Sequence, residues 1–157
     1  MKRLKKGFTL IELLVVIAII GILATTLAPK LREQLAKAKD AKAIALLGAA
    51  RTAGSVLFID SMIRDSDDGS ITAPTMGAIV AKLDDASQKV IDTSGSSITA
   101  KIGGSRTAET GGEMKYGGNI ELLIESDNDD LTVKFDEESS QGTGYKYSTE
   151  GKEWIEY

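Results

Sequence analysis

The chain of 157 residues contains no cysteine and no histidine. Without cysteine it can form no disulfide, no thiolate nucleophile and no cysteine-ligated zinc site. Without histidine it lacks the commonest general base and the commonest transition-metal ligand of proteins. These absences exclude much of enzyme chemistry, and the sequence predicts neither a catalytic site nor a cofactor.

Positive and negative charges occupy different parts of the chain. The formal net charge is −4, yet residues 1–11 hold four cations and no acid, whereas residues 65–157 hold 19 acids and 8 bases. Basic residues beside an apolar segment mark the cytoplasmic side of an inserted helix. An acidic second half argues against a phosphate-binding surface, so we predict no direct nucleic-acid site.

The segment that follows the basic residues is long and apolar enough to cross a membrane. Residues 13–29 are uncharged, and residues 8–12 extend the run with Glu12 as its one charge. About 20 helical residues reach about 30 Å, the thickness of a bilayer's hydrocarbon core. A carboxylate at that depth is costly and usually has a partner. Cleavage after Gly7 would leave the helix intact with a new amine on Phe8, so we expect Glu12 to pair with the amine of a second copy.

Two simpler interpretations are a cleaved secretory signal and a plain N-terminal anchor. The "TLA" at residues 26–28 could precede a signal-peptidase cut, although Pro29 would then follow the cut. The apolar stretch also exceeds the 7–15 residues typical of such signals. Helical periodicity continues beyond Pro29, which favours an uncleaved, longer helix.

Beyond Pro29 the pattern predicts an amphipathic continuation of the same helix. Pro29 is expected to kink the helix without ending it, and Gly21 adds a second weak point. The helix should run for about 50 residues, from Phe8 to near Ser61. Residues 43–50 and 52–59 are uncharged all round, which predicts burial on more than one side. The residues predicted to form the apolar face are Leu31, Leu35, Ala38, Ala45, Ala49, Ala53, Val56 and Ile63.

The rest of the chain predicts a small α/β head. A second short helix or a pair of turns is expected within residues 75–91, and residues 103–112 are expected to form a loop. Strands are expected within residues 97–102, 119–126, 131–136, 145–148 and 152–157. A few antiparallel strands cannot bury a face alone, but they can pack on the second half of the long helix. The predicted fold class is therefore α+β, with one long N-terminal helix against a small antiparallel sheet.

The stretch "GFTLIELLVVIAIIGILA" at residues 7–24 resembles the N-terminal signature of type IV prepilins and of the related pseudopilins of type II secretion. The matching positions are Gly7, Phe8, Glu12, Gly21 and Pro29. The resemblance implies a pilin-like fold and no enzymatic activity. It also implies a membrane prepilin peptidase that cuts between Gly7 and Phe8 and N-methylates Phe8. The chain would then comprise a cleaved leader (1–7), a transmembrane and filament-core helix (8–29), and an amphipathic helix with a globular head (30–157).

The same resemblance implies a place and a mechanism. The subunit would wait in the inner membrane as a single-pass helix with a cytoplasmic N-terminus. An inner-membrane platform and its ATPase would then lift it into an extracellular or periplasmic filament, a helical homopolymer or a mixed one. Glu12 is expected to set the axial register between helices, and the helix between Gly21 and Pro29 to melt during assembly.

Three functions are open on the sequence. The favoured one is a structural subunit of a type IV pilus, and the alternative is a pseudopilin of a type II secretion or DNA-uptake (competence) system. The third is an anchored domain that never polymerises, which the position of Glu12 within the apolar span disfavours.

Acidic clusters in the head are weak candidates for a calcium site. Residues 65–69 and 126–130 offer hard oxygen ligands, but their spacing matches no complete calcium loop, so solvated turns are expected. The calcium candidates in the second cluster are Asp127, Asp129 and Asp130. Asp84 and Asp85 are expected to be helix-surface charges. A core or cross-strand cluster is expected for the alternating aromatics Tyr145, Tyr147, Trp154 and Tyr157.

Overall fold

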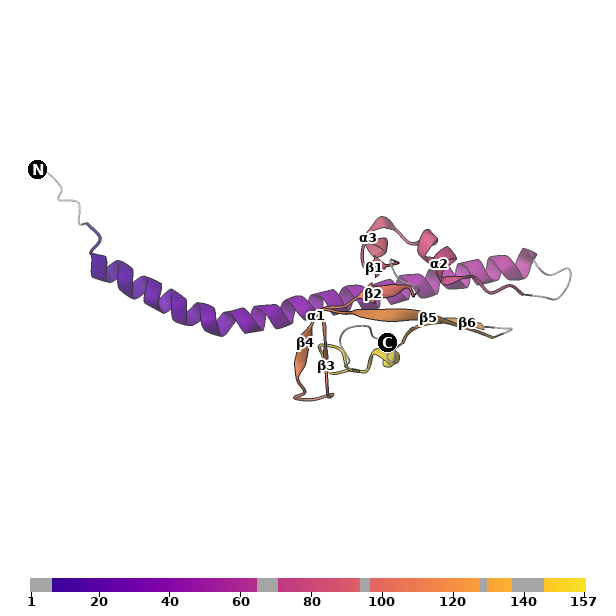
Figure 1. Cartoon of the computed structure of the whole chain (residues 1–157). Coiled ribbons are helices and arrows are strands. Elements are labelled where there is room, and N and C mark those ends of the chain that lie inside the picture. The colour runs from indigo at the N-terminus through magenta and orange to yellow at the C-terminus, as the bar shows by residue number, and fades with distance from the viewer. Residues whose placement is uncertain (1–6, 65–70, 94–96, 128–129, 137–145) are drawn as a thin grey trace, which may run out of the picture. The chain divides into compact units, whose positions relative to one another are not determined.

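The computed structural model of the chain describes residues 7–64, 71–93, 97–127, 130–136 and 146–157. The chain divides into two units, Met1–Gln34 and Leu35–Tyr157. Helix α1 (Leu10–Arg64) contributes to both, and the second unit adds a small antiparallel sheet (Figure 1). The predicted α+β, pilin-like fold class is confirmed.

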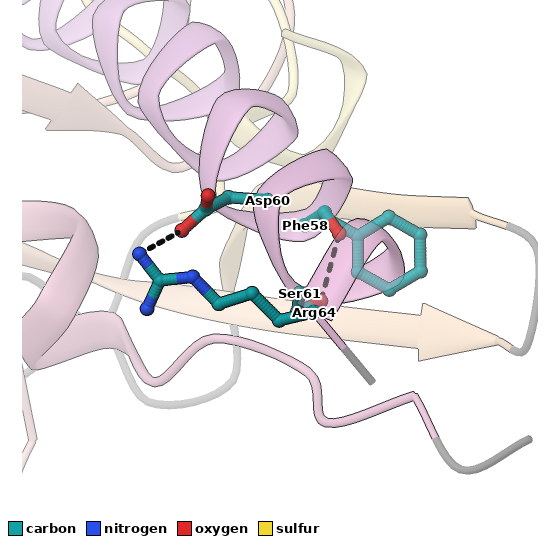
Figure 2. Close-up of polar contacts among 4 residues, drawn as sticks. All are labelled: Phe58, Asp60, Ser61 and Arg64. Atoms are coloured by element: carbon teal, nitrogen blue, oxygen red, sulfur yellow. Dashed lines mark hydrogen bonds and ion pairs between the residues drawn. The ribbon is translucent and has the colours of Figure 1, made fainter. Parts of the chain in front are cut away.

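Helix α1 closely follows its predicted extent. It has 55 residues, and Pro29 lies inside it without ending it, as expected. In its last turns, Ser61 Oγ donates a hydrogen bond of 2.7 Å to the main-chain oxygen of Phe58, and Arg64 pairs with Asp60 at 3.2 Å (Figure 2). The cation of Arg64 is favourable here because the C-terminal end of a helix carries partial negative charge.

The main sheet has four antiparallel strands in the order β1-β2-β5-β6. The strands are β1 (Ile91–Asp92), β2 (Thr99–Lys101), β5 (Asn119–Asp127) and β6 (Asp130–Asp136). On β6, alternate side chains are buried, as a sheet with one face on a core requires: Leu131, Val133 and Phe135. The strands predicted at residues 97–102, 119–126 and 131–136 are therefore confirmed.

The region predicted to contain a short helix or a pair of turns forms two short helices, α2 (Met76–Lys82) and α3 (Asp85–Gln88). Thr75 Oγ1 accepts a hydrogen bond from the amide of Ala78 and caps α2. Asp84 accepts a hydrogen bond from the amide of Ala86 and caps α3. The division follows from capping, because the extended backbone at Asp84 stops one helix and starts the next.

The predictions for residues 103–112 and 152–157 are wrong. The predicted loop at residues 103–112 contains β3 (Gly104–Arg106), which pairs with β4 (Met114–Tyr116). The strand predicted at residues 152–157 is instead a 3-10 helix, η1 (Trp154–Glu156). A turn of this kind brings side chains three residues apart onto one side, and Trp154 and Tyr157 use that spacing to meet.

The predicted aromatic cluster is confirmed for two of its members. Trp154 is fully buried, and its ring meets that of Phe135 edge-on with 5.6 Å between the ring centroids. The ring centroids of Trp154 and Tyr157 are 5.7 Å apart. Tyr147 is half-buried and forms isolated bridges in place of the strand predicted at residues 145–148. Tyr145 lies outside the described residues.

The prediction of which face of α1 is buried is wrong. Ala49 and Ala53 are half-buried, and the other six predicted residues are exposed: Leu31, Leu35, Ala38, Ala45, Val56 and Ile63. The buried residues of α1 are Ala36, Asp40, Ala43, Leu46, Leu47, Ala50, Gly54 and Phe58. Small residues decide this choice, because they let the sheet approach closely. A Cβ added at Gly54 would lie 2.8 Å from Cδ2 of Leu131.

Candidate functional site

The start of α1 is organised around Thr9 and Glu12. The main-chain amide and the hydroxyl of Thr9 each donate a hydrogen bond of 2.8 Å to Oε2 of Glu12. In return, the amide of Glu12 donates to Oγ1 of Thr9 at 3.4 Å. This reciprocal pair is a capping box, which satisfies amides that the first turn of a helix leaves unpaired. The spacing "TLIE" at residues 9–12 carries the signal for it, which the sequence-based prediction missed.

The capping box leaves part of the Glu12 carboxylate available. Both hydrogen bonds from Thr9 go to Oε2, and no described residue bonds to Oε1. A carboxylate has lone pairs for about four hydrogen bonds, so Oε1 can still accept one from a cation. Phe8 lies nearby in the sequence with an exposed fraction of 75%. Pairing of Glu12 with the amine of a second copy stays a prediction.

The apolar side chains of the first part of α1 are exposed. Its most apolar stretch of 18 residues contains no buried residue, and the helix is long and apolar enough to cross a membrane. The hydroxyl of Thr25 donates to the carbonyl of Ile22 at 2.8 Å, and that of Thr26 donates to the carbonyl of Leu23 at 2.9 Å. Both hydroxyls are therefore satisfied within the helix, as an apolar environment requires.

Gly21 and Pro29 both lie in this exposed stretch. A Cβ added at Gly21 would meet no other atom within 4 Å, so packing does not require glycine there. Pro29 has no amide hydrogen to donate to the preceding turn of the helix. The two positions lower the intrinsic stability of the helix between them, and melting of this stretch stays a prediction.

In the head, Asp40 is a buried carboxylate that joins α1 to two distant loops. Its Oδ1 accepts a hydrogen bond from the amide of Gly103 at 2.7 Å, and its Oδ2 accepts one from the amide of Thr149 at 2.9 Å. Burial raises the pKa of Asp40 above its ordinary value of 3.8. A Cβ at Gly103 would overlap the main-chain carbonyl of Ala36, so only glycine permits this approach. The role of Asp40 is structural, and the sequence-based prediction did not identify it.

The acidic clusters do not assemble a metal site in the part of the chain that the structure describes. No group of three or more carboxylates there could hold a metal ion. The backbones of Asp127 and Asp130 are partners at the end of β5 and β6, and Oδ1 of Asp130 accepts from the amide of Leu131 at 2.8 Å. Asp129 and residues 65–69 lie outside the described residues.

Comparison with known proteins assigns the N-terminal segment to a defined motif. A family profile described as "Prokaryotic N-terminal methylation motif" matches residues 2–28. This match includes Gly7, Phe8, Glu12 and Gly21, four of the positions that carry the resemblance to prepilins.

Curated relatives extend the similarity into the head. A type IV major fimbrial protein FimA of Dichelobacter nodosus is 50% identical over 129 residues, which cover 79% of this chain and 78% of the relative. Two shorter alignments cover less than half of the relatives' own length. Another FimA of D. nodosus is 42% identical over 41% of each chain, and the type IV major pilin protein PilE of Neisseria gonorrhoeae is 37% identical over 52% of this chain and 49% of its own.

No solved structure shows a significant similarity to the chain. The curated relatives above are named as fimbrial or pilin proteins, which are structural proteins and not enzymes. Together with the methylation motif and the pilin-like fold, the alignment over more than three quarters of both chains is decisive. The chain belongs to the type IV pilin family.

Proposed function

We propose that the chain is a structural subunit of a type IV pilus. The exposed first half of α1 is the observation that carries this proposal. Its apolar side chains find no cover among the residues that the structure describes: Leu10 and Ile11 are 80% and 69% exposed, and Phe8 just before the helix is 75% exposed. Such a surface needs lipid before assembly and the helices of neighbouring subunits after it.

The start of α1 supports processing between Gly7 and Phe8. Both residues precede the first helical residue, Leu10, so a peptidase can reach a non-helical backbone there. The new amine on Phe8, once N-methylated, would lie one residue before the capping threonine. In the filament, this amine pairs with Oε1 of Glu12 in a neighbouring subunit, while Thr9 of the same chain holds Oε2. One charged pair then penalises every other axial register of two apolar helices.

In this proposal, a prepilin peptidase and N-methyltransferase, an inner-membrane platform and an assembly ATPase act on the subunit in turn. The cations before Gly7 support a cytoplasmic N-terminus in the membrane-inserted precursor. The names of the curated relatives favour a pilus over a pseudopilus. Filaments sheared from cells and containing this chain would support that choice, and secretion that depends on the chain without such filaments would contradict it.

Intact-protein mass spectrometry of the mature chain tests the proposal. The expected mass is that of residues 8–157 plus one methyl group, with the methyl on the nitrogen of Phe8 in the N-terminal fragment ions. A Gly7→Val variant, whose branched side chain crowds the cut, should keep its leader. Gly21→Val is the matched control, because it makes the same change inside the helix and should be processed normally. An intact leader in the wild-type chain, or a cut after Ala28, would overturn the proposal.

A further inference from the structure

Four lysines from three parts of the head meet in one pocket. The pocket has a volume of about 380 Å³, and its apolar lining comes from Val90 and Ile102. Residues 117–119 form another part of its wall. The lysines are Lys39 and Lys42 of α1, Lys89 after α3, and Lys101 of β2.

These four cations are not neutralised within the described part of the chain. All four side chains are exposed, no carboxylate lines the pocket, and none of the four ammonium groups forms an ion pair with a described residue. Lys39 and Lys42 are also neighbours on one face of α1, where like charges repel. An assembly of cations that weakens the isolated subunit points to an anionic partner.

Exposed carboxylates that could bind these lysines lie at the far end of the β3–β4 hairpin. The pocket lies at the base of this hairpin, because residues 101–102 lead into β3 and residues 117–119 follow β4. Glu109 and Glu113 belong to the loop at its tip, which Figure 1 shows projecting away from α1. Three-residue strands hold the two ends about 10 Å apart.

A third carboxylate comes from a neighbouring turn. Gly151 packs so closely on Glu109 that an added Cβ would overlap the carbonyl of Glu109, which brings Glu150 beside the same loop. The side chains of Glu109, Glu113 and Glu150 are exposed and have no hydrogen bond or ion pair to a described residue. We call these three residues the acidic tip, and the four lysines the lysine pocket.

We propose that the lysine pocket of one subunit binds the acidic tip of a second copy of this chain. This inference rests on the proposed function, because a filament supplies the second copy. In a filament, two different, complementary patches on each copy meet in a heterologous contact, which repeats along an open helix when the rotation between copies closes no ring. The charges chiefly select the partner and the register, while apolar burial along α1 holds the filament together.

Charge reversal in cells that assemble the wild-type chain tests this contact. The pocket variant carries Lys89→Glu and Lys101→Glu, the tip variant carries Glu109→Lys and Glu150→Lys, and a third chain carries all four changes. Each two-site variant should lower the yield of sheared filaments by about tenfold, because like charges then face each other. The four-site chain should recover to within about twofold of wild type. Lys82→Glu, an exposed lysine outside the pocket, is the control and should assemble normally.

The outcomes distinguish a contact between subunits from a small-anion site and from a chain that never assembles. Normal yield from either two-site variant overturns the contact, and so does failure of the four-site chain to recover while it accumulates in the membrane at the wild-type level. Wild-type filament yield from the pocket variant, with loss of pyrophosphate binding to the filaments, would make the pocket a small-anion site instead. Absence of wild-type filaments, with a leader still attached to the chain, would show failure of the proposed function itself.

Discussion

The two halves of helix α1 are both rich in apolar residues, yet they meet different surroundings. From Leu10 to Gln34 the helix contains no buried residue, whereas eight residues are buried between Leu35 and Arg64. The second half packs on its own sheet and completes a core. The first half has no such cover among the described residues, so its apolar surface is available for association with lipid or with other subunits. One continuous helix therefore divides the tasks of folding and assembly.

The largest expected effect concerns Glu12, the one charge of the apolar run at residues 8–29. Glu12→Gln keeps an oxygen that can accept the hydrogen bonds of Thr9 but removes the negative charge. We expect filament yield to fall by about tenfold or more, because the proposed role of Glu12 in selecting the axial register depends on its charge. Insertion of the precursor in the membrane should be unchanged. Shearing and immunoblotting measure filament yield, and cell fractionation measures membrane insertion.

Thr9→Val is the matched control for this variant. It removes the hydroxyl of the capping box and retains the charge of Glu12, so assembly should stay within about twofold of wild type because only the cap is lost. If Thr9→Val abolished assembly while Glu12→Gln did not, capping and not charge would be the function of Glu12.

A matched pair of leucine truncations separates the two halves by stability. Leu47 is 1% exposed and Leu14 is 54% exposed. Leu47→Ala should lower the free energy of unfolding of the head by about 2–5 kcal/mol, because it leaves a cavity in the core. Leu14→Ala should change it by less than about 0.5 kcal/mol. Denaturant titration of the detergent-solubilised chain, followed by the fluorescence of buried Trp154, measures both, and equal losses would contradict the division.

Removal of the Asp40 carboxylate should weaken the junction between α1 and the loops of the head. Asp40→Ala leaves the amides of Gly103 and Thr149 without their acceptor, which costs about 1–3 kcal/mol of unfolding free energy. Asp60→Ala, on the exposed side of α1, is the control and should change stability by less than about 1 kcal/mol. Equal effects at both positions would show that burial of Asp40 is irrelevant.

The pH dependence of Asp40 has a defined sign. Because its pKa is raised in the folded state, the folded chain binds more protons than the unfolded chain in the pH range between 3.8 and the folded-state pKa. Its contribution to stability is complete below pH 3.8 and is lost as the pH rises through the folded-state pKa. The stability of the wild type minus that of Asp40→Asn should therefore fall with rising pH. A difference that rises instead would contradict the assigned shift.

Replacement of glycine by alanine should have the smallest effect on stability, and the sign of that effect should differ between the two halves of α1. Gly54→Ala should destabilise the head by about 1 kcal/mol, because the new Cβ presses on flexible ends of Leu131 and Ile79. Gly21→Ala meets no other atom and should stabilise the helix by about 1 kcal/mol. Amide hydrogen exchange near Gly21 should slow about fivefold as a result. Unchanged exchange there would argue against a weak point at Gly21.

Local patterns predicted most of the secondary structure. Hydropathy and helical spacing identified α1, and alternation identified β5 and β6, because such signals need no knowledge of distant residues. The prediction failed at residues 152–157, where Trp154 lies in η1. Apolar and aromatic composition favours a strand there, but burial of Trp154 against Phe135 decides the conformation.

The sequence by itself determined a long helix with an uncovered apolar first half and a single carboxylate, Glu12, near its start. Those properties follow from composition and order along the chain. Only the tertiary structure decided three other features. These are the side of α1 that packs on the sheet, the two amides that donate hydrogen bonds to Asp40, and the pocket that four lysines line. The helix offers apolar residues on more than one side, and small residues such as Gly54 select among them by fitting distant side chains. That fit depends on the shapes of segments far apart in the chain, which no local pattern encodes.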